Sequence, residues 1–203
     1  MIAIIDYGVG NLFSLCSSLN YIGAESIVTS DKKIIQSADK LILPGVGAFG
    51  DAIEKLRQTG LDTVIIEEAA KGKEIMGICL GMQLLFERSY EYGEHEGLGL
   101  LRGEVVPMKD SIPQNLKVPH IGWNALEFTR ESKLFKYIKG GDCVYFVHSY
   151  YARGCDDSLI ATAEYGKHLT AAVAKDNVMG CQFHPEKSGK VGMDILRAFC
   201  EEV

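Results

Sequence analysis

The chain has 203 residues, a formal net charge of −6, 47% hydrophobic residues and 24% charged residues. This length suits one compact domain with a sizeable buried core, so residues 1–203 are expected to form a single domain. The acidic balance argues against nucleic acid or an anionic membrane as the main partner. No apolar stretch approaches the roughly 20 residues that span a bilayer, so a soluble protein is expected.

The first half of the chain alternates short apolar segments with amphipathic ones. Strands that are apolar throughout and separated by helices predict a parallel sheet covered on both faces. The expected strands are residues 2–5, 26–29, 41–43 and the run before Cys79, and the expected helices are roughly residues 12–22, 48–58, 61–71 and the segment that follows Cys79.

The second half is richer in strands. A closing helix carries Val191, Ile195 and Phe199 at helical spacing, whereas residues 88–98 and 107–120 are polar or contain proline and are expected to be surface loops. The expected strands are neighbours, some of them antiparallel, at residues 143–147, 159–163, 171–174 and 178–183. The predicted fold class is therefore α/β, a single domain with a mixed, mostly parallel sheet flanked by helices.

The cysteines and histidines give no metal framework. The chain starts on a strand-like segment without a charged leader and cleavage site, which favours a cytoplasmic location and reduced thiols. The six cysteines are dispersed and include no C-x-x-C pair. Apart from His184, the histidines have no ligand spacing among them: His95, His120, His148 and His168. We expect neither a metal nor a cofactor.

Three glycine turns follow expected strands, at residues 7–11, 44–47 and 77–81. In open sheets of this kind, ligands bind at the carboxyl ends of the strands. Residues 45–50 match the dinucleotide-binding pattern G-x-G-x-x-G, but Glu67 and Glu68, at the acidic position that the pattern requires, fall in a helical segment. We therefore expect this turn to present backbone N–H groups to an oxyanion opposite Cys79, with a plain turn as the alternative.

Residues 77–81 place Cys79 between two glycines, where an apolar run gives way to a helical pattern. This arrangement is that of the nucleophile elbow of hydrolases, with sulfur in place of oxygen. A helix that begins there favours a thiolate and offers backbone N–H groups to a developing oxyanion. Taken alone, the segment fits a buried cysteine beside a tight turn equally well.

A base for Cys79 is expected in residues 182–186, near the end of the last strand. His184 at the carboxyl end of one strand can reach a thiol at the carboxyl end of another. Glu186 can orient the imidazole and stabilise its cationic form, and an imidazolium favours the nucleophilic thiolate. A turn histidine that caps a backbone group is the alternative for His184 alone, but the combination favours a catalytic triad.

With these three residues placed, the chain resembles the class I (triad) glutamine amidotransferases. Residues 77–83 resemble the nucleophile motif of that family, and residues 183–186 resemble its His/Glu motif. Further segments are similar to the family's glutaminase subunits of histidine biosynthesis: residues 6–11, 44–47, 120–124 and 145–150. The resemblance covers essentially the whole chain, so the acceptor chemistry is expected on another polypeptide.

The resemblance also implies roles for single residues. Cys79 attacks the carboxamide of glutamine, His184 protonates the departing ammonia and then activates water, and Glu186 orients His184. The oxyanion is held by backbone N–H groups of Leu80 and of the 45–47 turn, including Gly47. The residues implied to hold the amino-acid end of the substrate are Gln83, Glu91, Ser149 and Tyr150.

The implied partner is a (β/α)8-barrel cyclase subunit, which forms a heterodimer with this chain and receives the ammonia. Asn11, Trp123 and Lys187 are expected to contact it, although Trp123, the sole tryptophan in a loop-like segment, fits core packing as well. Three alternatives stay open: a stand-alone cysteine hydrolase of the same fold, a binding subunit whose catalysis has lapsed, and a paralogous glutaminase subunit that serves a surface-sugar pathway.

Overall fold

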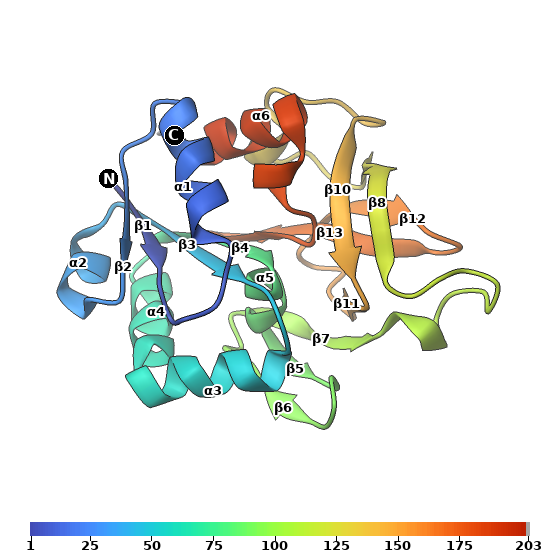
Figure 1. Cartoon of the computed structure of the whole chain (residues 1–203), viewed down its shortest axis with the longest axis horizontal. Coiled ribbons are helices and arrows are strands. Elements are labelled where there is room, and N and C mark those ends of the chain that lie inside the picture. The colour runs from blue at the N-terminus through green and yellow to red at the C-terminus, as the bar shows by residue number, and fades with distance from the viewer. Residues whose placement is uncertain (202–203) are drawn as a thin grey trace.

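A computed structural model describes residues 1–201 of the chain. Its centre is an eight-stranded sheet in the order β2-β1-β3-β4-β14-β13-β12-β9 (Figure 1). The parallel strands are β2 (Ser26–Thr29), β1 (Ile2–Ile5), β3 (Lys40–Gly45), β4 (Glu74–Cys79) and β14 (Val178–Cys181). The antiparallel strands that continue the sheet are β13 (His168–Lys175), β12 (Leu159–Glu164) and β9 (Glu127–Phe128). The predicted mixed, mostly parallel sheet is confirmed.

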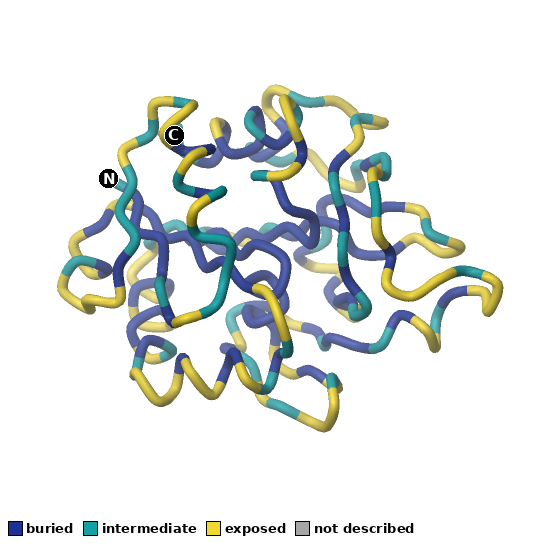
Figure 2. The backbone as a smooth tube through the Cα atoms, in the orientation of Figure 1, coloured by how far each residue is buried: buried dark blue, intermediate teal, exposed yellow. Residues whose placement is uncertain are grey.

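Helices cover both faces of this sheet, because successive side chains of the parallel strands point to opposite faces. Ile4 packs with α1 (Leu12–Tyr21) and α6 (Gly189–Cys200), whereas Ile5 packs with the helices of the other face. Those helices are α2 (Lys32–Ser37), α3 (Phe49–Thr59) and α4 (Leu61–Ala70). Figure 2 shows the resulting pattern, in which the central strands are buried and the exposed stretches lie on the helices and loops around them.

Two smaller sheets complete the second half of the chain. One pairs β10 (Cys143–His148) antiparallel with β8 (His120–Ala125). The other has the order β11 (Tyr150–Arg153), β7 (Leu101–Pro107), β5 (Phe86–Ser89) and β6 (His95–Glu96). The expectation that residues 143–147 lie beside residues 159–163 in one sheet is therefore wrong, and so is the loop predicted around Trp123.

Two local predictions also need correction. The helix after Cys79, α5, spans only Leu80–Leu84, and Phe86 already begins β5. The helix α2 was not predicted, because Ile35 is its only buried residue. Its start nevertheless has a sequence signal, since the Asp31 side chain accepts the backbone N–H groups of Lys33 and Ile34 at 2.7 and 3.2 Å.

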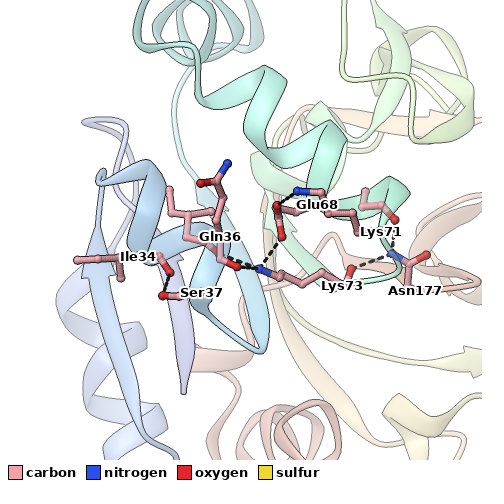
Figure 3. Close-up of polar contacts among 9 residues, drawn as sticks. Ile34, Gln36, Ser37, Glu68, Lys71, Lys73 and Asn177 are labelled. Atoms are coloured by element: carbon pink, nitrogen blue, oxygen red, sulfur yellow. Dashed lines mark hydrogen bonds and ion pairs between the residues drawn. The ribbon is translucent and has the colours of Figure 1, made fainter.

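An ionic cluster around the buried Glu68 fastens the helices to the amino ends of the central strands (Figure 3). The two carboxylate oxygens of Glu68, on α4, accept from Lys71 and Lys73, each at 2.6 Å. Lys73 also donates to the carbonyl oxygens of Ile35 and Gln36 at the end of α2. Because Glu68 is almost fully buried, burying its charge costs free energy, and the ion pairs with Lys71 and Lys73 offset this cost.

None of the helices in the described part of the chain is both long and apolar enough to cross a membrane.

Candidate active site

Cys79 lies at a sharp turn between β4 and α5. Its backbone adopts φ +55° and ψ −112°, a conformation that residues other than glycine rarely adopt. The flanking glycines permit the turn: a Cβ on Gly81 would collide with the carbonyl oxygen of Leu43, and one on Gly77 would lie 2.6 Å from the Cα of Met82. The strained elbow expected from residues 77–81 is therefore present, followed by a helix of little more than one turn.

His184 and Glu186 lie beside this turn, because β14 runs parallel to β4 and the chain leaves both strands at the same edge. The Nδ1 atom of His184 lies 2.9 Å from Oε1 of Glu186, and both side chains are buried. His184 also forms a side-chain hydrogen bond with Cys79. Burial alone would lower the pKa of His184, but Cys79 and Glu186 outweigh it and raise the pKa to about 9. The structure therefore holds an imidazolium between the sulfur of Cys79 and the carboxylate of Glu186.

These residues border a cavity of about 390 Å³. Cys79 and His184 line it, whereas Glu186 lies behind the imidazole and touches a second, much smaller hollow of about 10 Å³. All six residues that were predicted to bind glutamine line the large cavity: Gly47, Leu80, Gln83, Glu91, Ser149 and Tyr150. A cavity of this volume accommodates a small amino acid.

Two of these lining residues have defined polar contacts. Glu91 accepts the backbone N–H of Phe49 through Oε2 at 2.7 Å, and desolvation by burial raises its pKa. Both N–H groups of the Gln83 amide are used, one to the carbonyl oxygen of Tyr150 at 3.2 Å and one to Oε1 of Gln182 at 2.9 Å. Each side chain therefore keeps one oxygen that can accept from a ligand.

The three glycine turns meet at this edge of the sheet, as predicted. The Tyr7 hydroxyl donates to the carbonyl oxygen of Pro44 at 2.7 Å, and a Cβ on Gly10 would lie 3.3 Å from the Pro44 ring. A Cβ on Gly45 would lie only 2.8 Å from the amide nitrogen of Gly81. Gly47 has φ +96°, a conformation that favours glycine, so the turn beside Cys79 depends on it.

The three residues that were predicted to contact a partner lie in different surroundings. Lys187 lines its wall, and Asn11 lines the small hollow that also borders Glu186. Trp123 is 58% exposed on β8, with its ring edge toward Tyr145. Trp123 is thus a surface residue and not part of the core.

Sequence reasoning missed several residues of the site. Gln182 donates to the sulfur of Cys79, and His148 lines the cavity and pairs directly with His120 across the β10–β8 sheet. Gln182 immediately precedes the His/Glu motif, which was a signal for its position. Pro119 and Val147 are further lining residues that were not predicted, whereas Val46 belongs to the predicted 45–47 turn. Within residues 1–201, no group of three His, Cys, Asp or Glu side chains is placed to hold a metal ion.

The family model for class-I glutamine amidotransferases matches residues 3–203. Among solved structures, the chain is similar to a glutamine amidotransferase, with a TM-score of 0.76 at 19% identity over 98% of this chain and 97% of the other. It is also similar to PurLQS from Thermotoga maritima, with a TM-score of 0.72 at 20% identity over 98% and 96% of the two chains. At these identities the structural likeness supports the fold.

Curated relatives are much more similar in sequence. The imidazole glycerol phosphate synthase subunit HisH of Caldanaerobacter subterraneus subsp. tengcongensis is 51% identical over 100% of this chain and 98% of its own length. The subunit of the same name from Sulfurimonas denitrificans is 53% identical over 98% and 97%. The resemblance drawn from the motifs is thereby confirmed: the chain belongs to the class-I glutamine amidotransferases and, within them, to the family of imidazole glycerol phosphate synthase HisH subunits.

Proposed function

We propose that this chain hydrolyses glutamine to glutamate and ammonia through Cys79, His184 and Glu186, and that it supplies the ammonia to a cyclase subunit for imidazole glycerol phosphate synthesis. The observation that carries the proposal is the series of thiol, imidazole and carboxylate, in which Cys79 and His184 line the 390 Å³ cavity and Glu186 pairs with His184. The pathway is supported by the relatives that are 51% and 53% identical, which are imidazole glycerol phosphate synthase subunits.

The first half of the reaction forms a thioester. The thiolate of Cys79 attacks the carboxamide carbon of glutamine, and the carbonyl oxygen becomes an oxyanion. Backbone N–H groups of Leu80 and of the turn at Gly47 stabilise this charge. As the tetrahedral intermediate collapses, the C–N bond breaks and the His184 imidazolium gives its proton to the leaving nitrogen, which departs as ammonia.

The second half releases glutamate. His184, now neutral, takes a proton from a water molecule that attacks the thioester carbon, and the C–S bond then breaks to return the thiolate. Glu186 holds Nδ1 of His184 at 2.9 Å throughout, so the other ring nitrogen faces the reacting atoms. One carboxylate thus fixes both the tautomer and the orientation of the base.

The amino-acid end of glutamine carries an ammonium and a carboxylate, and the cavity offers partners for both. The remaining oxygens of Gln83 and Glu91 accept from the ammonium, and backbone groups of Ser149 and Tyr150, which also line the cavity, contribute further contacts. Glu91 is the one negatively charged group among the residues that line this wall of the cavity, which suits a cationic end of the substrate.

The ammonia is used by a second polypeptide, because the relatives that are 51% and 53% identical are named as subunits of imidazole glycerol phosphate synthase, which implies a partner cyclase subunit. We propose a (β/α)8-barrel cyclase as the partner in a heterodimer, docked over the mouth of the cavity. Ile121 and Trp123 alternate with the buried His120 on β8 and so share an exposed face, and Lys187 and Asn11 lie next to the triad. A reactive thiolate needs a reducing compartment, so we place the complex in the cytoplasm.

The test is to assay the complex with glutamine and, separately, with free ammonia. Cys79→Ala is expected to abolish glutamine-dependent synthesis and to spare ammonia-dependent synthesis. Loss of both activities would contradict the division of labour between the subunits. Glutamine hydrolysis by the isolated chain at the full rate of the complex would instead favour a stand-alone hydrolase.

A further inference from the structure

The sulfur of Cys79 has a second polar neighbour besides His184. Nε2 of Gln182 donates a hydrogen bond to Sγ of Cys79, with an N···S distance of 3.7 Å. Gln182 follows the last residue of β14, and no part of it is exposed to solvent. A fully buried amide directed at the reacting atom is therefore present, and the reaction described above does not use it.

The orientation of this amide is fixed by its hydrogen bonds. Gln83 donates to the carbonyl oxygen of Tyr150, and because a carbonyl only accepts, the Gln83 nitrogen must face it. The second N–H of Gln83 then faces Gln182, which must present its oxygen in return. Because the oxygen of the Gln182 amide faces Gln83, its nitrogen faces Cys79. The N–H group that donates to the sulfur is therefore oriented, through Gln83, by the carbonyl oxygen of Tyr150.

A pair of buried histidines holds the Tyr150 carbonyl in place. Burial lowers the pKa of His148 to about 3, so its ring is neutral and carries one proton. Nδ1 of His148 donates to the Tyr150 oxygen at 2.9 Å, which leaves Nε2 to accept from Nδ1 of His120 at 3.1 Å. The Asn124 amide, 3.4 Å from Nε2 of His120, fixes that ring in turn. The carbonyl oxygen of Tyr150 therefore accepts two hydrogen bonds, one from Gln83 and one from His148.

We propose that Gln182 is a positioning residue for the nucleophile, whose amide N–H, aimed by Gln83 and the Tyr150 carbonyl, stabilises the thiolate of Cys79. This inference rests on the proposed function. A hydrogen-bond donor favours the charged form of its acceptor. His184 must release its proton in each turnover, whereas the Gln182 amide keeps its own and remains available whenever the sulfur carries charge.

Two other titratable groups near the sulfur carry no charge at neutral pH. Burial raises the pKa of Tyr7, after β1, and raises that of Cys181, on β14, well above its ordinary value, and the charge of the Cys79 thiolate adds to both shifts. Both groups are therefore uncharged at neutral pH. Besides His184, the charged side chains that line the same cavity are those of Glu91, in the loop after β5, and Lys187, after β14.

The test follows the alkylation of Cys79 by iodoacetamide as a function of pH. Gln182→Glu keeps the shape of the side chain and the acceptor for Gln83 but replaces the donor with a carboxylate. Subtracting the rate of the matching Cys79→Ala protein removes the signal of the other five cysteines. We expect the pH midpoint of alkylation to rise by about one unit or more in Gln182→Glu.

The same variant is also assayed in the complex. Its kcat for glutamine should fall about 10- to 100-fold, which corresponds to the loss of one hydrogen bond to a charged group, and its KM should change less than about threefold.

Two further variants separate charge from donor loss and from folding. Gln182→Met removes the donor without adding charge, and it should raise the midpoint by less than Gln182→Glu. Gln58→Glu makes the same chemical change on the exposed face of α3 and should leave the profile unchanged. Should the Gln182 variants fail to fold, Gln83→Met frees the Gln182 amide to rotate and should raise the midpoint by itself.

An alkylation midpoint that stays at the wild-type value in every folded variant of Gln182 and Gln83 would overturn the inference. A lower melting temperature with an unmoved midpoint would do the same, because it assigns Gln182 a role in stability alone. Retention of glutaminase activity by Cys79→Ala would contradict the proposed function instead. The two failures are therefore distinguishable in one set of proteins.

Discussion

The two ends of the central sheet are both polar and buried, but they use their polar groups differently. At the amino ends of the strands, Glu68 meets Lys71 and Lys73 with its two oxygens, and Asn177 ties the turn before β14 to carbonyl oxygens near the same place (Figure 3). Every oxygen of that carboxylate has a cationic partner. The cluster holds α4 against the sheet and keeps no capacity for a ligand.

At the carboxyl ends of the strands, some polar atoms have no hydrogen-bond partner and the backbone is strained. Oε2 of Glu186 is buried without a hydrogen-bond partner among residues 1–201, and Gln83 keeps an acceptor toward the cavity. Cys79 holds a backbone conformation that costs free energy. Buried polarity by itself therefore does not mark a functional site; unsatisfied groups next to a strained backbone do.

The largest effect is expected from removing the base. His184→Asn should lower kcat/KM for glutamine in the complex about 10²- to 10⁴-fold, because neither ammonia departure nor water attack then has a proton carrier. His168→Asn, at the exposed start of β13, is the matched control and should retain wild-type activity. A His184 variant that kept a tenth of the wild-type activity would contradict the assignment of catalysis to the carboxyl ends of the central strands.

A smaller loss is expected when the base is kept but its orienting carboxylate is neutralised. In Glu186→Gln, the raising effect of the carboxylate is lost and burial is opposed by Cys79 alone, so the pKa of His184 should fall below about 9. Less imidazolium at neutral pH means slower thioester formation, by about 10- to 100-fold. The imidazole NMR signal followed against pH measures the pKa directly, and an unchanged titration would contradict the assignment.

At the opposite end the expected effect is on stability. Glu68→Gln should reduce the free energy of unfolding by about 1–3 kcal/mol at pH 7, since Lys71 and Lys73 lose a charged partner. Activity per folded molecule should not change. Urea unfolding measures the difference, and Glu67→Gln, the exposed neighbour on α4, is the control.

The same variant has a defined pH dependence. Burial raises the pKa of Glu68, but the hydrogen bonds from Lys71 and Lys73 outweigh it, so the pKa lies below its ordinary value. A carboxylate with a lowered pKa stabilises the fold above its unfolded-state pKa and loses this contribution as pH falls through the folded-state pKa. The stability gap between wild type and Glu68→Gln should therefore narrow below about pH 4. A gap that stays constant would show that the Glu68 charge contributes nothing.

The parts of the molecule that local patterns encode were predictable. The strands β1, β3 and β4 are buried on both faces and so appear as continuous apolar runs. The Cys79 turn and the His184–Glu186 pair are likewise local, because glycine spacing and a two-residue offset specify them. The three glycine turns could be predicted to lie close together because the carboxyl ends of parallel strands meet at one edge of the sheet.

Contacts that depend on the exact register between distant strands were not predictable. The His120–His148 contact joins residues 28 positions apart, and the Gln182–Cys79 contact joins residues 103 positions apart. Both exist only because β8 pairs with β10 and β14 lies beside β4 in one register. A sequence does not state these registers, and a shift of one residue would turn each side chain to the other face.

The smallest effect on the isolated chain is expected at Trp123. Since its ring is mostly exposed, Trp123→Ala should change neither the melting temperature nor glutamine hydrolysis by the isolated chain. The affinity for the cyclase subunit should nevertheless fall about 10- to 100-fold, because exposed tryptophans on apolar surfaces are frequent binding hot spots. Titration calorimetry of the two subunits measures this change.

Tyr21→Ala provides the matched control for this surface. Tyr21 is 82% exposed at the far end of α1, about 15 Å along the helix from Asn11, so its loss should leave the affinity unchanged. If Trp123→Ala bound the cyclase normally, or melted at a lower temperature, the ring would serve the fold of this subunit and not its partner. The carboxyl end would then be a site for glutamine chemistry, with the route of the ammonia lying elsewhere on the surface.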